Sequence, residues 1–150
     1  MNKVFLSLGL LVAVTVISIS SFAQIRKIPA EVTEALKSKY PDASNVTWKD
    51  KLTVFAASFE MSGENFEARF TSKGEWQSTE KQIAESNLPG EVKDGLDKSK
   101  YADWETKSIF LIELPDNITQ YRIQVAKSDI QKKNLLFSMD GRLLKDNITL

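Results

Sequence analysis

Apolar residues along the chain recur first with the period of a helix. Counting from Val32, they fall at i, i+3, i+4 and i+8, which places them in one stripe along a helix face. A proline precedes the stripe, where its missing N–H costs a helix nothing, and Tyr40-Pro41 follows it, where a helix ends. The pattern therefore predicts a helix between Pro29 and Tyr40, with a stripe formed by Val32, Ala35, Leu36 and Tyr40.

The period then shortens to two residues, which is typical of strands with one buried face. Between Thr53 and Met61 every second residue is apolar, and between Glu64 and Thr71 an apolar row alternates with charged and hydroxyl side chains. Shorter strands are expected near residues 46–48 and after Gly74. The sequence thus predicts four antiparallel strands whose core-facing residues are Phe55, Ala57, Phe59, Met61, Phe66, Ala68 and Phe70.

The same order of patterns occurs a second time along the chain. "IPAEVTEALKSKYPDASNVTW" (28–48) is followed by "LPGEVKDGLDKSKYADW" (88–104), and "FTSKGEW" (70–76) is followed by "FSMDGRL" (137–143). We therefore predict an α+β fold of two tandem copies of a helix packed on a four-stranded antiparallel sheet, spanning residues 24–84 and 85–150. The core rows of the second copy are Tyr121, Ile123, Val125, Leu135, Phe137 and Met139.

Two details of this pattern concern glycines. Gly95 stands where the first helix has Ala35, which weakens the second helix by about 1 kcal/mol, and a close approach to the sheet would compensate for that cost. Gly74 decides which way Trp76 points. A two-residue loop would turn Trp76 outward, whereas a three-residue loop with a glycine bulge pairs it with Phe70 and turns it into the core. We favour the bulge, because lysine at position 73 tolerates a positive φ poorly.

The first 23 residues have the pattern of a secretory leader. Lys3 precedes an apolar run, and Ser21-Phe22-Ala23 places small residues where signal peptidase reads them, so cleavage is expected between Ala23 and Gln24. The chain lacks cysteine, which excludes a lipid-attachment site, and no later segment is apolar enough for a membrane span. We expect the mature protein to be periplasmic or secreted.

These features resemble the PepSY-like family of exported bacterial proteins. The resemblance rests on the leader, on "IPAEV…L…YPDA…W", on the glycine turn before Trp76 and on the tandem second copy, and it covers essentially the whole mature chain. It implies a fold related to the beta-lactamase inhibitory protein and a location in a Gram-negative cell envelope. Related proteins act by binding other proteins, so the resemblance implies a binding function. It carries no functional residue onto this sequence, and "KYADW" departs from the "KYPDASNVTW" of the first copy.

Composition removes most enzymatic chemistry. Without histidine or cysteine, neither a Ser-His-Asp nor a Cys-His site can form, and zinc loses its preferred ligands. The paired acids at positions 31 and 34, and at 94 and 97, lie among lysines on expected solvent faces. We therefore predict no catalytic residue, no cofactor and no metal site. The mature chain carries 19 basic and 20 acidic side chains, a net charge near −1, which gives no reason to expect a nucleic acid or an anionic membrane as partner.

One segment has more apolar residues than the scaffold requires. "SIFLIEL" (108–114) is apolar on both faces of one strand, and Leu136 lies opposite its core-facing neighbours. Such a patch on an open sheet face is typical of a partner-binding surface, unless the other copy or a second chain already covers it. The predicted binding residues are Trp104, Phe110, Ile112 and Leu136, beside Arg122 and Gln124.

The leading hypothesis is a non-catalytic protein-binding module that engages another envelope or extracellular protein. Inhibition of a peptidase or other hydrolase by steric occlusion is the form of binding that the resemblance suggests. The alternative is a structural or sensory envelope protein that self-associates through the same face, for example as a homodimer. Because a fold hosts many functions, neither hypothesis follows from the fold alone.

Overall fold

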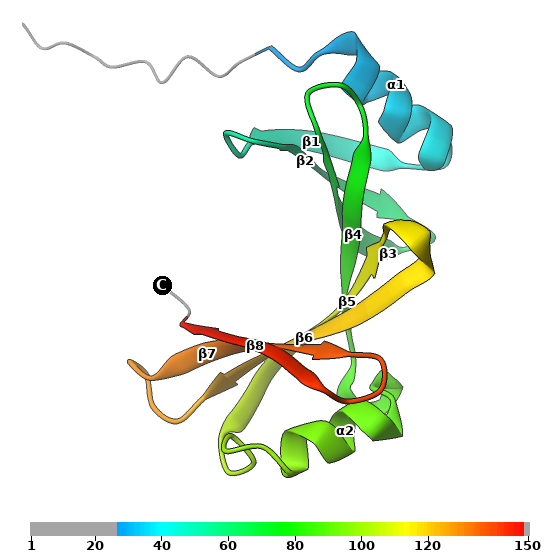
Figure 1. The fold of residues 1–150 in the computed structure, drawn as a ribbon. Coiled ribbons are helices and arrows are strands. Elements are labelled where there is room, and N and C mark those ends of the chain that lie inside the picture. Colours follow the sequence, from blue (N-terminus) through cyan, green and yellow to red (C-terminus); the bar gives the residue numbers. More distant parts are fainter. Residues whose placement is uncertain (1–26, 149–150) are drawn as a thin grey trace, which may run out of the picture.

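The computed structural model describes residues 27–148 and contains two helices and eight strands (Figure 1). The expected leader and its cleavage site lie outside these residues. Each helix starts directly after a proline, Pro29 or Pro89, which is the cap residue and not the first helical residue. The elements are α1 Ala30–Lys39, β1 Ser44–Asp50, β2 Phe55–Met61, β3 Glu64–Phe70, β4 Trp76–Ile83, the 3-10 turn η1 Glu85–Asn87, α2 Gly90–Asp97, β5 Glu105–Leu114, the 3-10 turn η2 Pro115–Asn117, β6 Ile118–Ala126, β7 Lys132–Ser138 and β8 Leu143–Ile148.

All eight strands belong to one antiparallel sheet, in which spatial order follows chain order from β1 to β8. The α+β class is as expected, but the two four-stranded sheets of the prediction are joined into one. The junction is the β4–β5 pair, whose register runs from Thr79↔Glu113 to Ile83↔Ile109. Sequence periodicity predicts which residues share a face of a strand, but it carries no information about which strands pair at an edge. The continuous sheet therefore could not be predicted from the sequence pattern.

Both helices pack on the same face of the sheet, and each covers a separate core. Val32 and Leu36 of α1 pack on β2 and β3, whereas Val92 of α2 packs on β6 and β7. The sheet curves strongly between them, with α1 and α2 on its outside and the helix-free face concave (Figure 1). The largest fully buried side chains of the two cores are Val32, Phe55, Phe70, Val92, Ile123, Val125, Leu135 and Phe137.

The two glycine turns have the same geometry. In the first, the Thr71 N–H donates to Glu75 O (2.9 Å) and the Gly74 N–H donates to Thr71 O (3.0 Å). In the second, the Ser138 and Gly141 amides make the equivalent bonds, each at 3.0 Å, and both turns are followed by a register shift. The expected bulge is confirmed, since Trp76 pairs with Phe70 and packs against the first core.

The tip of each glycine turn rests on a helix, and the second contact is the closer one. A Cβ added at Gly95 would lie 2.0 Å from the carbonyl oxygen of Gly141, which no side chain can occupy. In the first half, a Cβ at Gly74 would lie 2.5 Å from Glu31 O and 3.4 Å from the Ala35 Cβ. The expectation that Gly95 permits a close approach to the sheet is confirmed.

Met139 is a correction to the predicted core. Its position continues the alternation of Leu135 and Phe137, but β7 ends at Ser138 and Met139 begins the glycine turn. Its side chain is 62% exposed as a result. The three-residue loop interrupts the period-two pattern one residue before the sequence suggests.

Candidate protein-binding face

The helix-free face of the sheet carries the predicted patch around the β4–β5 junction. Along β5, Ile109 points to the second core and is 3% exposed, whereas Phe110 and Ile112 point to the opposite face and stay partly exposed. The register places Phe110 beside Gln82 on β4 and Arg122 on β6, and Arg122 beside Leu136 on β7. These residues form one row across four strands, Ile112 lies in a neighbouring row beside Glu80, and neither helix covers them.

Five of the six predicted residues lie on this concave face. Phe110, Ile112, Arg122, Gln124 and Leu136 are all partly exposed there. Gln124 pairs with Ser108, whose hydroxyl donates to its side-chain oxygen at 3.4 Å. Within the described residues the other half of the chain does not cover the patch, whose side chains stay partly exposed.

Trp104 is a correction to the predicted patch. It packs against the second core, where its ring meets Tyr101 edge to face at a centroid distance of 5.2 Å. The cause is a β-bulge between Thr106 and Ser108, at Lys107. Thr106 pairs with the buried Val125, so even-numbered residues before the bulge face the helix side and those after it face the open side. Trp104 and Phe110 are both even-numbered and would share a face of a regular strand, but a bulge of one residue between them reverses the alternation.

A chain of paired charges crosses the same face. Glu67 on β3 and Glu80 on β4 are register partners, an arrangement that repels unless a cation lies between them. Arg69 supplies that cation, with contacts of 2.8 Å to Glu67 and 3.6 Å to Glu80. Arg122 then reaches Glu80 at 3.1 Å from β6. We call Glu67, Arg69, Glu80 and Arg122 the charge ladder.

The charge ladder joins the two halves and borders the apolar patch. Glu80 comes from the first half and Arg122 from the second, and their side chains are 13% and 25% exposed. The guanidinium of Arg122 also lies 4.4 Å from the centre of the Phe110 ring, a favourable cation–π distance. The centre of the face thus presents apolar surface beside charges that already neutralise one another.

The sequence identified Arg122 but missed the other three members of the ladder. Glu67 and Arg69 stand out only as the polar side of an amphipathic strand, which is ordinary for a sheet. The position of Glu80 opposite Glu67 is set by the register of β3 and β4, which the bulge at the glycine turn shifts. The signal that could have identified them is their shared parity, because residues opposite a core row all lie on the helix-free face.

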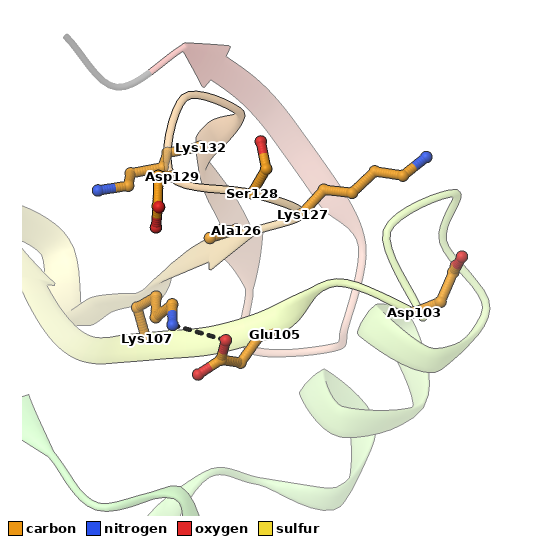
Figure 2. Close-up of a pocket in the computed structure, with 8 residues that line it drawn as sticks. All are labelled: Asp103, Glu105, Lys107, Ala126, Lys127, Ser128, Asp129 and Lys132. Carbon is orange, nitrogen blue, oxygen red and sulfur yellow. Dashed lines mark ion pairs between the residues drawn. The ribbon is translucent and has the colours of Figure 1, made fainter.

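One hollow of the described residues lies away from the patch. It has a volume of about 290 Å³ and lies between the start of β5 and the β6–β7 hairpin, and Figure 2 shows its lining of lysines, acids and Ser128. Lys107 and Glu105 form an ion pair of 2.6 Å beside it. Among residues 27–148, no group of three or more acids is arranged to hold a metal ion. No helix of that part of the chain is long and apolar enough to cross a membrane.

The fold and this face define a class: a curved antiparallel sheet with two helices outside and an open inner face. A family model described as "Putative beta-lactamase-inhibitor-like, PepSY-like" matches residues 54–145, which is more than half of the chain. The chain belongs to this PepSY-like family.

Solved structures with the same fold come from Bacteroides species. A "putative periplasmic" protein of Bacteroides eggerthii is 26% identical, with a TM-score of 0.74 over 81% of this chain and 89% of the other. A BLIP-like protein of Bacteroides fragilis is 27% identical, with a TM-score of 0.70 over 81% and 86%. A DUF2874 family protein of Bacteroides ovatus is 25% identical, with a TM-score of 0.74 over 81% and 88%. No curated protein matches the chain.

Proposed function

We propose that this protein is an exported, non-catalytic module that binds another envelope or extracellular protein through its concave sheet face. The observation that carries the proposal is the row of Phe110, Arg122 and Leu136, an apolar patch on a face that no helix covers. Monomers rarely leave such surface open unless it serves an interaction. Aromatic and arginine side chains are also the residues that most often anchor protein interfaces.

The charge ladder supports a protein partner over a charged small molecule. A partner that covers Glu80 and Arg122 removes water from charges that are already paired with one another, so desolvation leaves no charge alone. The partner surface opposite the patch would accordingly be apolar and uncharged at its centre. Occlusion of a peptidase or other hydrolase is the inhibitory form of this proposal, in keeping with the beta-lactamase-inhibitor-like description of the family.

The finer features of the proposal concern origin and location. We infer that residues 24–84 and 85–150 are tandem copies of one unit, an inference supported by the matching turns at Gly74 and Gly141. Export is supported by the leader pattern of residues 1–23 and by the similarity to the "putative periplasmic" protein of Bacteroides eggerthii. Cleavage between Ala23 and Gln24 is the expected processing step.

Crosslinking in envelope extract tests the proposal directly. The exported protein would be compared with Phe110→Asp and with Met139→Asp, a matched control that places the same charge at an exposed apolar residue in the turn beside α2. We expect one envelope protein to be recovered with the wild type and the control but not with Phe110→Asp. If that protein is a hydrolase, its activity should fall on titration with wild type only.

Two other outcomes would redirect the proposal. Recovery of only the protein itself, together with a mass that rises with concentration in light scattering, would favour the self-associating alternative. Equal recovery of a partner by wild type and folded Phe110→Asp would exclude the concave face as the binding surface.

A further inference from the structure

The two most exposed large apolar side chains of the described residues lie at hairpin tips. Ile130, in the β6–β7 hairpin, is 94% exposed, and Leu52, in the β1–β2 hairpin, is 86% exposed. Both tips project to the same side of the molecule, at the two ends of the concave face (left in Figure 1). The proposed function of the concave face uses neither residue.

Leu52 has an unfavourable backbone conformation at the tip of its hairpin. Its φ of 67° lies in the left-handed region, which a branched side chain rarely adopts. The Leu52 N–H donates to the Asp50 carboxylate at 3.0 Å, so the tip is fixed by a local bond. Glycine or asparagine would adopt this backbone conformation at a lower cost. An exposed leucine side chain contributes no burial that would offset the cost. Backbone outliers of this kind are concentrated at functional sites.

Lysines flank both tips. Lys49 and Lys51 precede Leu52, with Asp50 as the acidic neighbour, while the segment 127–133 around Ile130 carries three lysines and Asp129. Lys127 and Lys132 extend to opposite sides of the hairpin (Figure 2). The other acids near this tip are Asp103 and Glu105, and Glu105 is neutralised by Lys107. Lys133 lies over the Tyr101 ring and acts on Asp146, so the two tips together present four lysines, Lys49, Lys51, Lys127 and Lys132, against two aspartates, although the whole chain is neutral.

We propose that the two tips dock the protein on an anionic phospholipid surface. Aliphatic side chains at the tips would enter the headgroup boundary, and the flanking lysines would meet lipid phosphates, which is the combination that holds peripheral proteins on membranes. Because the tips lie at the two ends of the concave face, both can touch one flat membrane surface at the same time. The concave face would then open toward the lipid, so a partner bound there would be held near the membrane.

Vesicle sedimentation tests this proposal without any protein partner. The protein recovered after export, its N-terminus checked by mass spectrometry, would be mixed with vesicles of equal parts phosphatidylglycerol and phosphatidylcholine, or of phosphatidylcholine alone. We expect binding to the anionic vesicles only, weakened by salt because lysine–phosphate attraction is screened. The double variant Leu52→Asn and Ile130→Asn should lower the partition coefficient about tenfold, since the apolar contribution is lost.

Two controls separate the tips from the rest of the surface. Met139→Asn removes an exposed apolar side chain beside α2 and should leave vesicle binding unchanged. Lys51→Gln with Lys132→Gln should weaken binding to anionic vesicles even if the asparagine variants fail to fold. Absence of vesicle binding, equal binding to neutral vesicles, or an equal loss with Met139→Asn would each overturn the proposal. Phe110→Asp should still bind vesicles, so failure of the concave-face proposal would be seen separately.

Discussion

The two halves of the molecule share a scaffold but are fastened differently. In the first half, Gly74 lies against the Glu31 carbonyl and the Ala35 side chain of α1, and Tyr40 bonds to the hydroxyl of Thr79. In the second half, Gly95 and Gly141 bring backbone against backbone, and Tyr101 donates instead to the carboxylate of Asp146. The same turn geometry therefore occurs with two distances between helix and turn. The shorter distance, in the second half, requires glycine on the helix as well as in the turn.

The tyrosine pairs differ in chemistry as well as in partner. Thr79 is 3% exposed, the one buried polar residue of the described chain, and it also accepts the indole N–H of Trp76 at 2.8 Å. Asp146 lies on the edge strand β8 and is shared with Lys100 at 3.1 Å. The first half thus uses an uncharged bond inside the sheet, whereas the second fastens its last strand with a charged group at the surface.

Alanine at the turn glycines should give the largest difference between the halves. Gly141→Ala combines a left-handed φ of 82° with a Cβ only 2.0 Å from Glu91 O, and we expect a loss of about 3–4 kcal/mol in unfolding free energy. Gly74→Ala meets Glu31 O at 2.5 Å and should cost about 2–3 kcal/mol. Urea unfolding at constant slope measures both changes.

Gly63 supplies the control for these substitutions. It has a φ of 77° in the β2–β3 turn, but nothing lies within 4 Å of its added Cβ. Gly63→Ala should therefore show the backbone cost alone, about 1 kcal/mol. Equal losses at all three glycines would mean that the contact with the helix contributes nothing, and the difference between the halves would then be only geometric.

Removing Glu80 tests whether the halves depend on each other. Glu80→Gln takes a largely covered carboxylate from between Arg69 and Arg122, and we expect a loss of about 1–2 kcal/mol in unfolding free energy. Glu64→Gln is the matched control, because its pair with Lys81 is half exposed and should contribute about 0.5 kcal/mol or less.

Hydrogen exchange read strand by strand shows where the Glu80 effect acts. Amides of β3 and β4 in the first half and of β5 and β6 in the second should lose protection together in Glu80→Gln. Loss confined to β3 and β4 would contradict a ladder that joins the halves, since Arg122 would then gain nothing from Glu80.

Much of this fold could be predicted from the local pattern of apolar residues. The wrong predictions arise where the alternation of a strand shifts by one residue or where two sheet edges pair. The core rows of β2, β3, β6 and β7 follow directly from period two, because each strand is regular. Trp104 and Met139 failed because a bulge at Lys107 and the end of β7 at Ser138 shift the alternation by one residue. The bulge at Lys107 depends on the partner strand and, unlike the one at the Gly74 turn, has no glycine to mark it in the sequence.

The candidate site could be predicted only where its residues stand out within a single strand. Phe110, Ile112 and Leu136 stand out as apolar residues opposite a core row, and the structure places them together across β5 and β7. Glu80 could not be identified, because its importance comes from the β4–β5 pairing that joins the halves. Tertiary pairing sets which ordinary surface charges become neighbours.

The tyrosine bonds that fasten the two halves should also respond to different ends of the pH scale. Bonds from Tyr101 and Lys100 hold the pKa of Asp146 below its ordinary value. A carboxylate whose pKa is lowered on folding stabilises above its unfolded pKa, and that contribution is lost as pH falls through the folded value. Tyr101→Phe should therefore lower the melting temperature at neutral pH, and the difference from wild type should shrink in acid.

Tyr40 responds at the other end of the scale. Burial raises the pKa of its phenol, with the Thr79 bond opposing and Glu113 adding to the rise. Its contribution is present below the unfolded pKa of the phenol and is lost as pH rises through the folded value. Tyr40→Phe should reduce the alkaline loss, to which the buried phenol of Tyr121 with its raised pKa also contributes, and should leave the acid limb unchanged. Melting curves for both variants across the pH range measure the contrast, and identical profiles would contradict the assignment.

The smallest effect on folding is expected on the concave face itself. Phe110→Asp removes a ring that is partly exposed and stacked on Arg122, but it offers Arg122 a carboxylate in return, so the loss in unfolding free energy should be about 1 kcal/mol or less. Ile109→Asp, one residue away, buries an unpaired charge in the second core and should prevent folding. Circular dichroism and urea unfolding of the two variants decide between an open and a covered face. If Phe110→Asp unfolds like Ile109→Asp, the face is closed in solution by a second chain, and the patch is an internal contact of a dimer.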